Sequence, residues 1–503
     1  MMKETICGIL FVFMFNCVVS NAQIENLENS AYTFAIQPKA GTPSGHSLTG
    51  HKVEEVYGDL KSTLFLFSQG NNKFCLLTSP LRVEEGPLHD FCVEKLSHSL
   101  GISKSAVITN SSHNHTIPYI DVSENNRPDY PQSLCWDLGR DFIEGLENAV
   151  AHVIDNLTPV TVEWGVAEEN RITYNRKGKY PDGTSFFMRE EDRLALAGNG
   201  YHGVIDPEAT VVLFKNYEGK PVSVLSFFTG HPVAAYNPEK LISFGQFPQV
   251  ATEILSEYFG GIPVGFVQGC AGNINSKHML TGTIEDANLL GKYLGESFLV
   301  AAKSLRPSKR SGLEWSRETV NIPFANLPDV EELEQDLNSI DDFIRRGNSG
   351  DENTLKCVGM NFPRALTPPY RAKLVELIRP WYVWALEQHK TGSLNNLPDF
   401  LTFNIIVARF GDVGFVGLPY EPFVETGLII KKESDLPCVL TCGYTDGDYG
   451  YIPNGEGVDD REYMSSFYRY SAISYPTPIP PYKYPGGDAC AEIAIKIISK
   501  YAR

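Results

Sequence analysis

The order of elements over residues 221–267 constrains the fold of this chain more than any other feature. An apolar run at 221–228 has the length of a strand. Apolar residues at helical spacing follow from Phe247 to Tyr258, and a pair of glycines ends this helix. A second apolar run, Pro263 to Val267, comes next. A strand, a helix and a strand in this order form a parallel pair joined by a crossover helix, so the segment predicts an α/β fold.

The same patterns recur along the chain and give most of its expected elements. Strands are expected at 62–68, 73–80, 160–165, 209–215, 402–409, 413–418 and 437–443, and helices at 88–100, 138–157, 328–344, 370–388 and 489–501. Gly411-Asp412 stands between two of these strands and predicts a hairpin. The whole pattern predicts a mixed, largely parallel sheet flanked by helices. Ligands of such sheets bind at the C-terminal ends of the strands, so we expect the active site there.

The chain of 503 residues shows no internal repeat and no long flexible linker. Length alone suggests about three domains, but without a linker we expect one catalytic domain over residues 23–503. The acidic helix and polar loop at 328–353 are its least core-like part, which makes them a candidate insertion.

The first 22 residues have the pattern of a secretory signal peptide. Lys3 supplies a basic start, Ile6 to Val19 an apolar core, and Ser20-Asn21-Ala22 a cleavage site. Because no later stretch has the length of a membrane helix, we expect a soluble exported protein, secreted or periplasmic. The net charge of −18 argues against nucleic acids or anionic membranes as partners held by charge. A lipid substrate held by apolar contacts is compatible with this negative net charge.

Two histidines follow the apolar run Ala106–Thr109, within the stretch Ser111–Thr116. His113 and His115 are two residues apart, so their side chains point to the same side if the backbone stays extended. Neutral imidazole is the commonest metal ligand, which makes a metal site the first interpretation. A polar loop that happens to hold two histidines is the alternative.

Other predicted strands also end at side chains that bind metals. His231, Glu421, and Tyr449 or Tyr451 each follow a predicted strand. A catalytic zinc takes three or four nitrogen or oxygen ligands with one position open for water. The metal lowers the pKa of that water to about 7 and polarises a carbonyl, which suits hydrolysis of amides or esters. Singly, these residues are also explained as a turn histidine, a turn cap or packed rings, so their common placement is what favours a metal site.

Six segments, in the same order along the chain, resemble motifs of the neutral/alkaline ceramidase family. They are Ser112–Thr116 (similar to THTHSG), Asn175-Arg176 (NRR), Phe228–Pro232 (a strand followed by HP), Gln268–Asn273 (Q-x-x-x-G-D), Leu418–Phe423 (LPGEPF) and Asp448–Tyr451 (NDYxGY). The resemblance runs over nearly the whole mature chain. Ceramidases carry a C-terminal β-sandwich domain after the tyrosine motif, whereas only about fifty residues remain here. The chain therefore resembles the shorter bacterial ceramidase-like members of the family.

This resemblance implies a site with one zinc ion per chain, made by His113, His231, Glu421 and Tyr451. It implies that His115 is an acid/base or orienting group beside the metal and that Tyr463 lies near the substrate carbonyl. Arg176 and Gly269, from the arginine motif and the glutamine loop, are the further expected catalytic positions. The implied activity is hydrolysis of an N-acyl amide bond, as in ceramidases.

The glutamine loop departs from the family pattern at two positions. Gly269 stands where ceramidases have a serine implicated in catalysis, and Asn273 stands where they have an aspartate. The substrate therefore stays open between a small amphiphile with an N-acyl group and an acylated glycan, cleaved by a deacylase, esterase or lyase. A binding protein that keeps the metal without catalysis is a third alternative. The oligomeric state also stays open.

Overall fold

The computed structural model describes residues 26–45, 50–123, 132–179, 185–187, 202–238, 240–280, 283–455, 461–474, 477–483 and 486–502. The predicted signal peptide at 1–22 lies outside these residues. Among the helices that the structure describes, none combines the length and the apolar character needed to cross a bilayer.

The larger sheet has nine strands. Its order is β13-β11-β10-β6-β1-β3-β4-β5, and β15 pairs with β6. These strands are β1 (Glu28–Ile36), β3 (Leu60–Gln69), β4 (Asn72–Ser79), β5 (Val107–Ser111), β6 (Thr158–Glu168), β10 (Glu208–Asn216), β11 (Pro221–Phe228), β13 (Val264–Gln268) and β15 (Arg306–Pro307).

Two strand pairs of this sheet are parallel. Strand β11 pairs in parallel with β13 across the crossover helix α4 (Gln246–Tyr258), which confirms the sequence prediction. Strand β4 pairs in parallel with β5, with α1 (Gly86–Leu100) between them in the chain. The other pairings are antiparallel. The mixed α/β fold is thus confirmed, but the expectation of a largely parallel sheet is wrong, because tight turns such as that at Gly70 join antiparallel neighbours.

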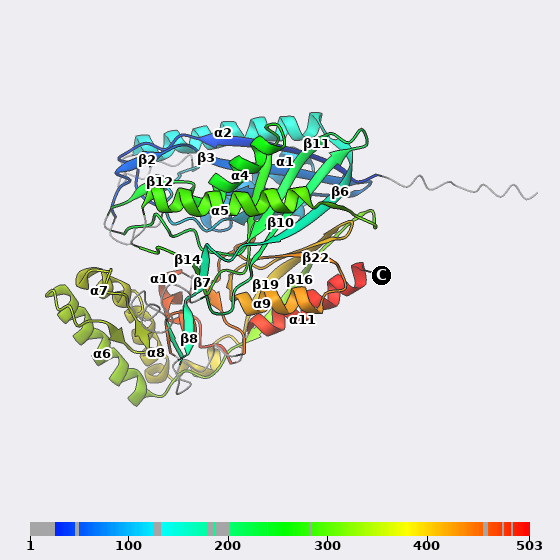
Figure 1. The fold of residues 1–503 in the computed structure, drawn as a ribbon. Helices are drawn as coiled ribbons and strands as arrows, with labels where there is room; N and C mark the ends of the chain where they lie inside the picture. The colour runs from blue at the N-terminus through cyan, green and yellow to red at the C-terminus, as the bar shows by residue number, and fades with distance from the viewer. Residues whose placement is uncertain are drawn as a thin grey trace, which may run out of the picture.

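The larger sheet is covered by helices on one face and by a second sheet on the other. Successive residues of β3 show this, since Leu64 and Leu66 pack under α2 (Gln132–Asp155), whereas Phe65 and Phe67 belong to a core shared with the second sheet. In the same way α4 and α5 (Ile284–Lys303) cover the outer face of β10, β11 and β13. Side chains alternate between the faces of a strand, so each strand contributes to both cores. Figure 1 shows these helices gathered around the larger sheet.

The second sheet has the order β16-β19-β20-β22. Its strands are β16 (Leu313–Pro323), β19 (Phe400–Phe410), β20 (Val413–Gly417) and β22 (Cys438–Cys442). Strands β19 and β20 form the predicted hairpin around Gly411, whose φ of 59° fits the turn. Strands β20 and β22 are parallel, with α9 (Val424–Glu433) between them in the chain. Helix α11 (Gly486–Tyr501) packs on the outer face of this sheet (Figure 1).

A group of helices, α6 (Val330–Asn348), α7 (Pro368–Glu376) and α8 (Arg379–Thr391), lies to one side of the second sheet (Figure 1). The single helix predicted at 370–388 is wrong: the structure has two helices there. Pro380, near the start of α8, lacks the N–H that a continuous helix would use. The group has its own hydrophobic core. The single domain over residues 23–503, with 328–353 as a candidate insertion, stays a prediction.

Short strand pairs complete the described fold. They are β2 (Glu55–Tyr57) with β12 (Ile242–Phe244), β7 (Thr173–Asn175) with β14 (Ile274–Ser276), β8 (Lys177–Lys179) with β9 (Ser185–Phe187), β17 (Lys356–Cys357) with β18 (Met360–Asn361), and β21 (Glu421–Pro422) with β23 (Tyr451–Ile452). Short helices are η1 (Lys104–Ala106), η3 (Ser393–Asn396), η4 (Phe467–Tyr470) and α10 (Ser471–Ser474).

Candidate metal centre

Polar side chains gather where strand ends of the two sheets meet. An isolated bridge joins Asn110 to Thr445, and another joins Gly269 to Cys442. The C-terminal ends of β5 and β13 in the larger sheet therefore lie beside the end of β22 in the second sheet. Ligands of α/β sheets bind at the C-terminal ends of the strands, which we call the strand-end rule. The junction is therefore the location that this rule predicts for a site.

His113 reaches this junction through a turn in the backbone. Strand β5 is buried throughout and ends at Ser111. The N–H of His113 donates to Ser111 Oγ at 3.0 Å, and His113 has a φ of 56°. The sequence argument assumed an extended backbone from His113 to His115, and this assumption is wrong. Their rings nevertheless lie together, with centroids 5.0 Å apart.

His231 is held rigidly after β11. Its N–H donates to Ile274 O at 3.0 Å. Its ring Nδ1 lies 2.6 Å from Ala271 O and 3.2 Å from Ile274 O. A carbonyl oxygen only accepts hydrogen bonds, so Nδ1 carries the ring proton. Nε2 is then left with a lone pair, which is the form of histidine that binds metals.

Glu421 completes a cluster with the two histidines. It lies in β21, directly opposite Tyr451 in β23. Its Oε2 is 3.0 Å from His231 Nε2 and 3.5 Å from His113 Nε2. Ligand atoms of His113, His115 and His231 all lie within 4.8 Å of one another. The structure thus brings three of the four predicted ligands, and the predicted helper His115, into one place.

Tyr451, rather than Tyr449, is the predicted tyrosine that faces this cluster. The Tyr451 hydroxyl lies close enough to Glu421 to lower the pKa of its carboxyl group. It also accepts from Arg176 Nη2 at 2.8 Å, and the same guanidinium donates to Gly272 O. Tyr449 stacks instead on Phe403, with centroids 5.4 Å apart.

The predicted catalytic residues Arg176, His115 and Tyr463 surround the cluster. Tyr463 places its ring 5.4 Å from the ring of Tyr451. The His115 ring lies 5.1 Å from that of Tyr236, whose hydroxyl is 3.2 Å from the hydroxyl of Tyr370 in α7. The α6–α8 group therefore borders the His115 side of the cluster.

Burial sets the charges of the cluster. Burial, with help from Arg176, lowers the pKa of His231 to about 3. Burial and the neighbouring His231 likewise lower the pKa of His115 well below its usual value. Burial raises the pKa of Glu421 to about 7, although Arg176 lowers it. Both rings are thus neutral at neutral pH.

The donor atoms fit a divalent metal. His231 Nε2 and Glu421 Oε2 are both acceptors and face each other at 3.0 Å. Such a contact is favourable only with a proton or a positive ion between the two atoms. Neutral imidazoles and a carboxylate are nitrogen and oxygen donors that zinc takes, and the phenol of Tyr451 adds a further oxygen.

Sequence reasoning missed three residues of this region. Tyr444 lies against the cluster, and its hydroxyl is 3.3 Å from Glu421 Oε2. Carboxylate oxygens of Glu84 and Asp448 lie within 4.8 Å of each other and of a ring nitrogen of His113. Tyr444 follows the predicted strand at 437–443, so the strand-end rule applied to every polar residue would have found it.

No protein-family model matches the chain, and no curated protein matches it. Solved structures do. The neutral ceramidase from Pseudomonas aeruginosa matches with a TM-score of 0.61 and 14% identity, over 95% of this chain and 75% of that chain. A ceramidase complexed with C2 matches with a TM-score of 0.60 and 14% identity, over the same shares of the two chains. This chain has the neutral ceramidase fold. The family resemblance inferred from six short motifs is thereby confirmed for the fold.

Within this ceramidase fold, close packing explains Gly269. A Cβ at Gly269 would overlap the Thr229 hydroxyl and lie 2.9 Å from Thr229 Cβ. The N–H of Gly269 donates to Phe228 O at 2.9 Å. Asn273, the other departure, donates to Glu425 and accepts from the N–H of Val424, so it holds the start of α9. Close packing therefore accounts for the glycine at position 269. A catalytic role for Gly269 stays a prediction.

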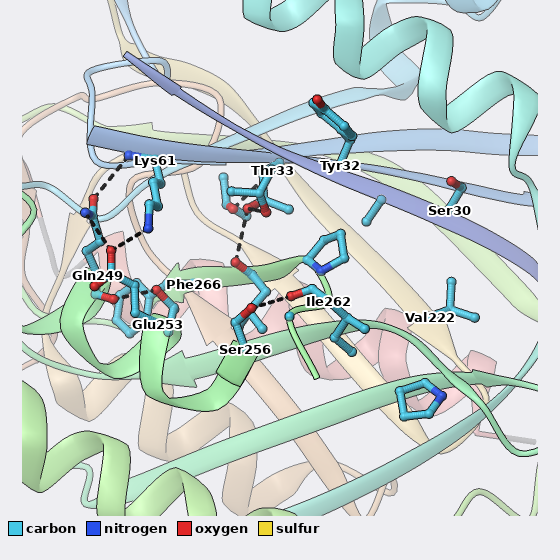
Figure 2. Close-up of a pocket in the computed structure, with 18 of the residues that line it drawn as sticks. Ser30, Tyr32, Thr33, Lys61, Val222, Gln249, Glu253, Ser256, Ile262 and Phe266 are labelled. Carbon is cyan, nitrogen blue, oxygen red and sulfur yellow. Dashed lines mark hydrogen bonds and ion pairs between the residues drawn. The ribbon is translucent and has the colours of Figure 1, made fainter. Parts of the chain in front are cut away.

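A cavity of about 1090 Å³ lies apart from the candidate metal centre. Figure 2 shows it between Tyr32 and Thr33 on one side and Ser256 and Ile262 on the other. None of the four predicted ligands is among its described lining residues, although Ser112, the neighbour of His113, is. The cavity is therefore a groove between α2 and α4, and it is separate from the donor atoms of the candidate metal ligands.

Proposed function

We propose that this protein is an exported zinc-dependent hydrolase that cleaves an N-acyl amide bond, as ceramidases do. The observation that carries the proposal is the convergence of His113, His231 and Glu421, with Oε2 of Glu421 at 3.0 and 3.5 Å from the two Nε2 atoms. The likeness to ceramidase structures supports it, because the match extends over 95% of the chain. Tyr451 is the proposed fourth ligand.

The surrounding residues have the properties that amide hydrolysis requires. Zinc, when bound, acts as a Lewis acid on the acyl carbonyl and activates water for attack. His115 is neutral because of its burial, so it can accept a proton during attack and return it to the leaving amine. Arg176 holds the Tyr451 hydroxyl with a hydrogen bond of 2.8 Å. Tyr463, whose ring lies 5.4 Å from that of Tyr451, is the proposed donor to the oxyanion that develops on the carbonyl.

Metal analysis of the purified protein tests the proposal. We expect about one zinc per chain, with the metal lost in His113→Ala and His231→Ala. His98→Ala is the matched control, because His98 is exposed on α1 and does not belong to the cluster. Full metal occupancy in both ligand variants would refute the site.

A substrate panel tests the reaction. It contains N-acyl lipids, including N-acyl sphingoid bases, and acetylated oligosaccharides. We expect turnover of the N-acyl lipids by the zinc-loaded protein and none after zinc removal. Turnover of the oligosaccharides alone would replace the proposal with a glycan deacylase at the same centre. Zinc binding without any turnover would replace it with a binding function.

A further inference from the structure

Tyr444 occupies a strained position beside the candidate metal ligands. It follows β22 and is fully buried, with a relative exposure of 0%. Its φ is 52°, in the left-handed region that an aromatic residue rarely adopts. Strain of this kind persists only where the surrounding structure imposes it, and it concentrates at functional sites.

The backbone of Tyr444 joins the segments that carry two of the proposed ligands. Its N–H donates to Tyr420 O at 3.0 Å, next to Glu421. Its carbonyl accepts from the N–H of Ser111 at 3.1 Å, two residues before His113. The strained conformation therefore fixes the end of β5 against β21, and with it the spacing of the two ligands.

The side chain of Tyr444 contacts three of the proposed ligands. Its hydroxyl lies 3.3 Å from Glu421 Oε2 and 3.5 Å from His231 Nε2. Its ring stacks on that of His113, with centroids 4.4 Å apart and an angle of 30° between the planes. The Tyr451 hydroxyl, by contrast, accepts from Arg176 Nη2 at 2.8 Å.

The direction of the hydrogen bond follows from its partners. A carboxylate only accepts, and His231 Nε2 is also an acceptor because Nδ1 carries the ring proton. The Tyr444 hydroxyl therefore donates, and the carboxylate is its nearer acceptor. Groups that hold a metal ligand by a hydrogen bond commonly change metal affinity 10- to 100-fold when they are removed.

We propose that Tyr444 is a positioning residue of the metal centre, whose phenol donates to Glu421 while its ring holds His113. This rests on the proposed function, because it presumes that Glu421 and His113 bind the metal. Tyr444 acts through these ligands and is not itself a ligand.

Tyr444→Phe tests the role because it removes the hydroxyl and keeps the ring. Zinc is titrated into the metal-free variant against a chelating competitor, so the readout is affinity and not turnover. We expect affinity about 10- to 100-fold weaker than that of the unmodified protein. We also expect the visible spectrum of the cobalt-loaded variant to change, because the geometry of Glu421 changes.

Tyr420→Phe is the matched control. Tyr420 is as fully buried and adjoins Glu421, but its ring packs on Phe403 in the core of the second sheet. We expect zinc affinity within about twofold of the unmodified protein in this variant. An equal loss of affinity in both variants would overturn the proposal, since it would show a general packing effect.

The remaining outcomes separate the proposal from the function on which it rests. Unchanged zinc affinity in Tyr444→Phe, with tight binding by the unmodified protein, would overturn the role of Tyr444 alone. Absence of zinc binding by the unmodified protein would overturn both. In the copper-loaded protein, a phenolate charge-transfer band should persist in Tyr444→Phe and vanish in Tyr451→Phe. Loss of the band in Tyr444→Phe would make Tyr444 a ligand and overturn the positioning role.

Discussion

His231 Nε2 lies 3.0 Å from Glu421 Oε2, and this contact joins the larger sheet to the second sheet. His231 follows β11 of the larger sheet, whereas Glu421 follows β20 of the second sheet. Both atoms are acceptors, so without a proton or a metal ion the contact opposes the packing of one sheet on the other. A bound metal would turn it into a link between the sheets.

Glu421→Gln should therefore change how zinc affects stability. A glutamine amide can donate to His231 Nε2, so the metal-free variant should be at least as stable as the unmodified protein. Zinc at about 100 times its dissociation constant should stabilise the unmodified protein by about 2.7 kcal/mol and the variant much less. Thermal unfolding with and without zinc measures this. Equal stabilisation of both proteins would show that Glu421 does not bind the metal.

His115→Ala should separate metal binding from catalysis. If His115 moves a proton and does not bind the metal, the variant keeps its zinc and its kcat falls about 10²- to 10⁴-fold. Metal content and kcat on the best N-acyl substrate are measured on the same preparation. Loss of the metal together with activity would instead assign His115 to the ligands.

Much of the fold was predictable because local patterns determine it. Periodicity predicted α4 and β13 on either side of a pair of glycines, and a parallel pair followed from their order. The position of β6 between β10 and β1 was not predictable, because it depends on packing between elements far apart in the chain. The antiparallel character of the sheet was missed for the same reason.

The site was predictable as far as it follows strand ends. His113, His231 and Glu421 were found in this way, and the structure brings them together. Tyr444 also follows a predicted strand, but it was missed because among the 24 tyrosines only Tyr449 and Tyr451 were considered as ligands at a strand end. Glu84 was missed because its approach to His113 arises from the close packing of two chain segments after β4 and β5.

Gly269→Ser should destabilise the protein instead of restoring a catalytic serine. The added side chain would overlap the Thr229 hydroxyl. Overpacking of this kind costs about 1–3 kcal/mol of unfolding free energy. Urea unfolding measures the loss, and adding Thr229→Ala should recover part of it by making room. A gain in acyl hydrolysis by Gly269→Ser at unchanged stability would contradict the packing explanation and support a catalytic role for the position.

Because Glu84 is buried, the stability of the metal-free protein should fall as pH rises. Glu84 is fully buried, with a relative exposure of 0%. Burial raises its pKa to about 8, although Arg82 lowers it. In the unfolded chain a glutamate has a pKa of about 4.3. Between these values the folded protein holds a proton that the unfolded chain releases, so the free energy of unfolding decreases as pH rises from about 4.3 to 8.

Glu84→Gln should remove this pH dependence, because glutamine stays neutral in both states. The free energy of unfolding of the metal-free variant, relative to that of the unmodified protein, should therefore rise between pH 5 and pH 8. Urea unfolding at both pH values measures the difference. Glu94→Gln is the control, since Glu94 is exposed on α1, and its relative stability should not change with pH in this range. If Glu84→Gln gave the same stability difference at pH 5 and pH 8, Glu84 would be ionised in the folded protein, and the cluster beside His113 would carry a full negative charge.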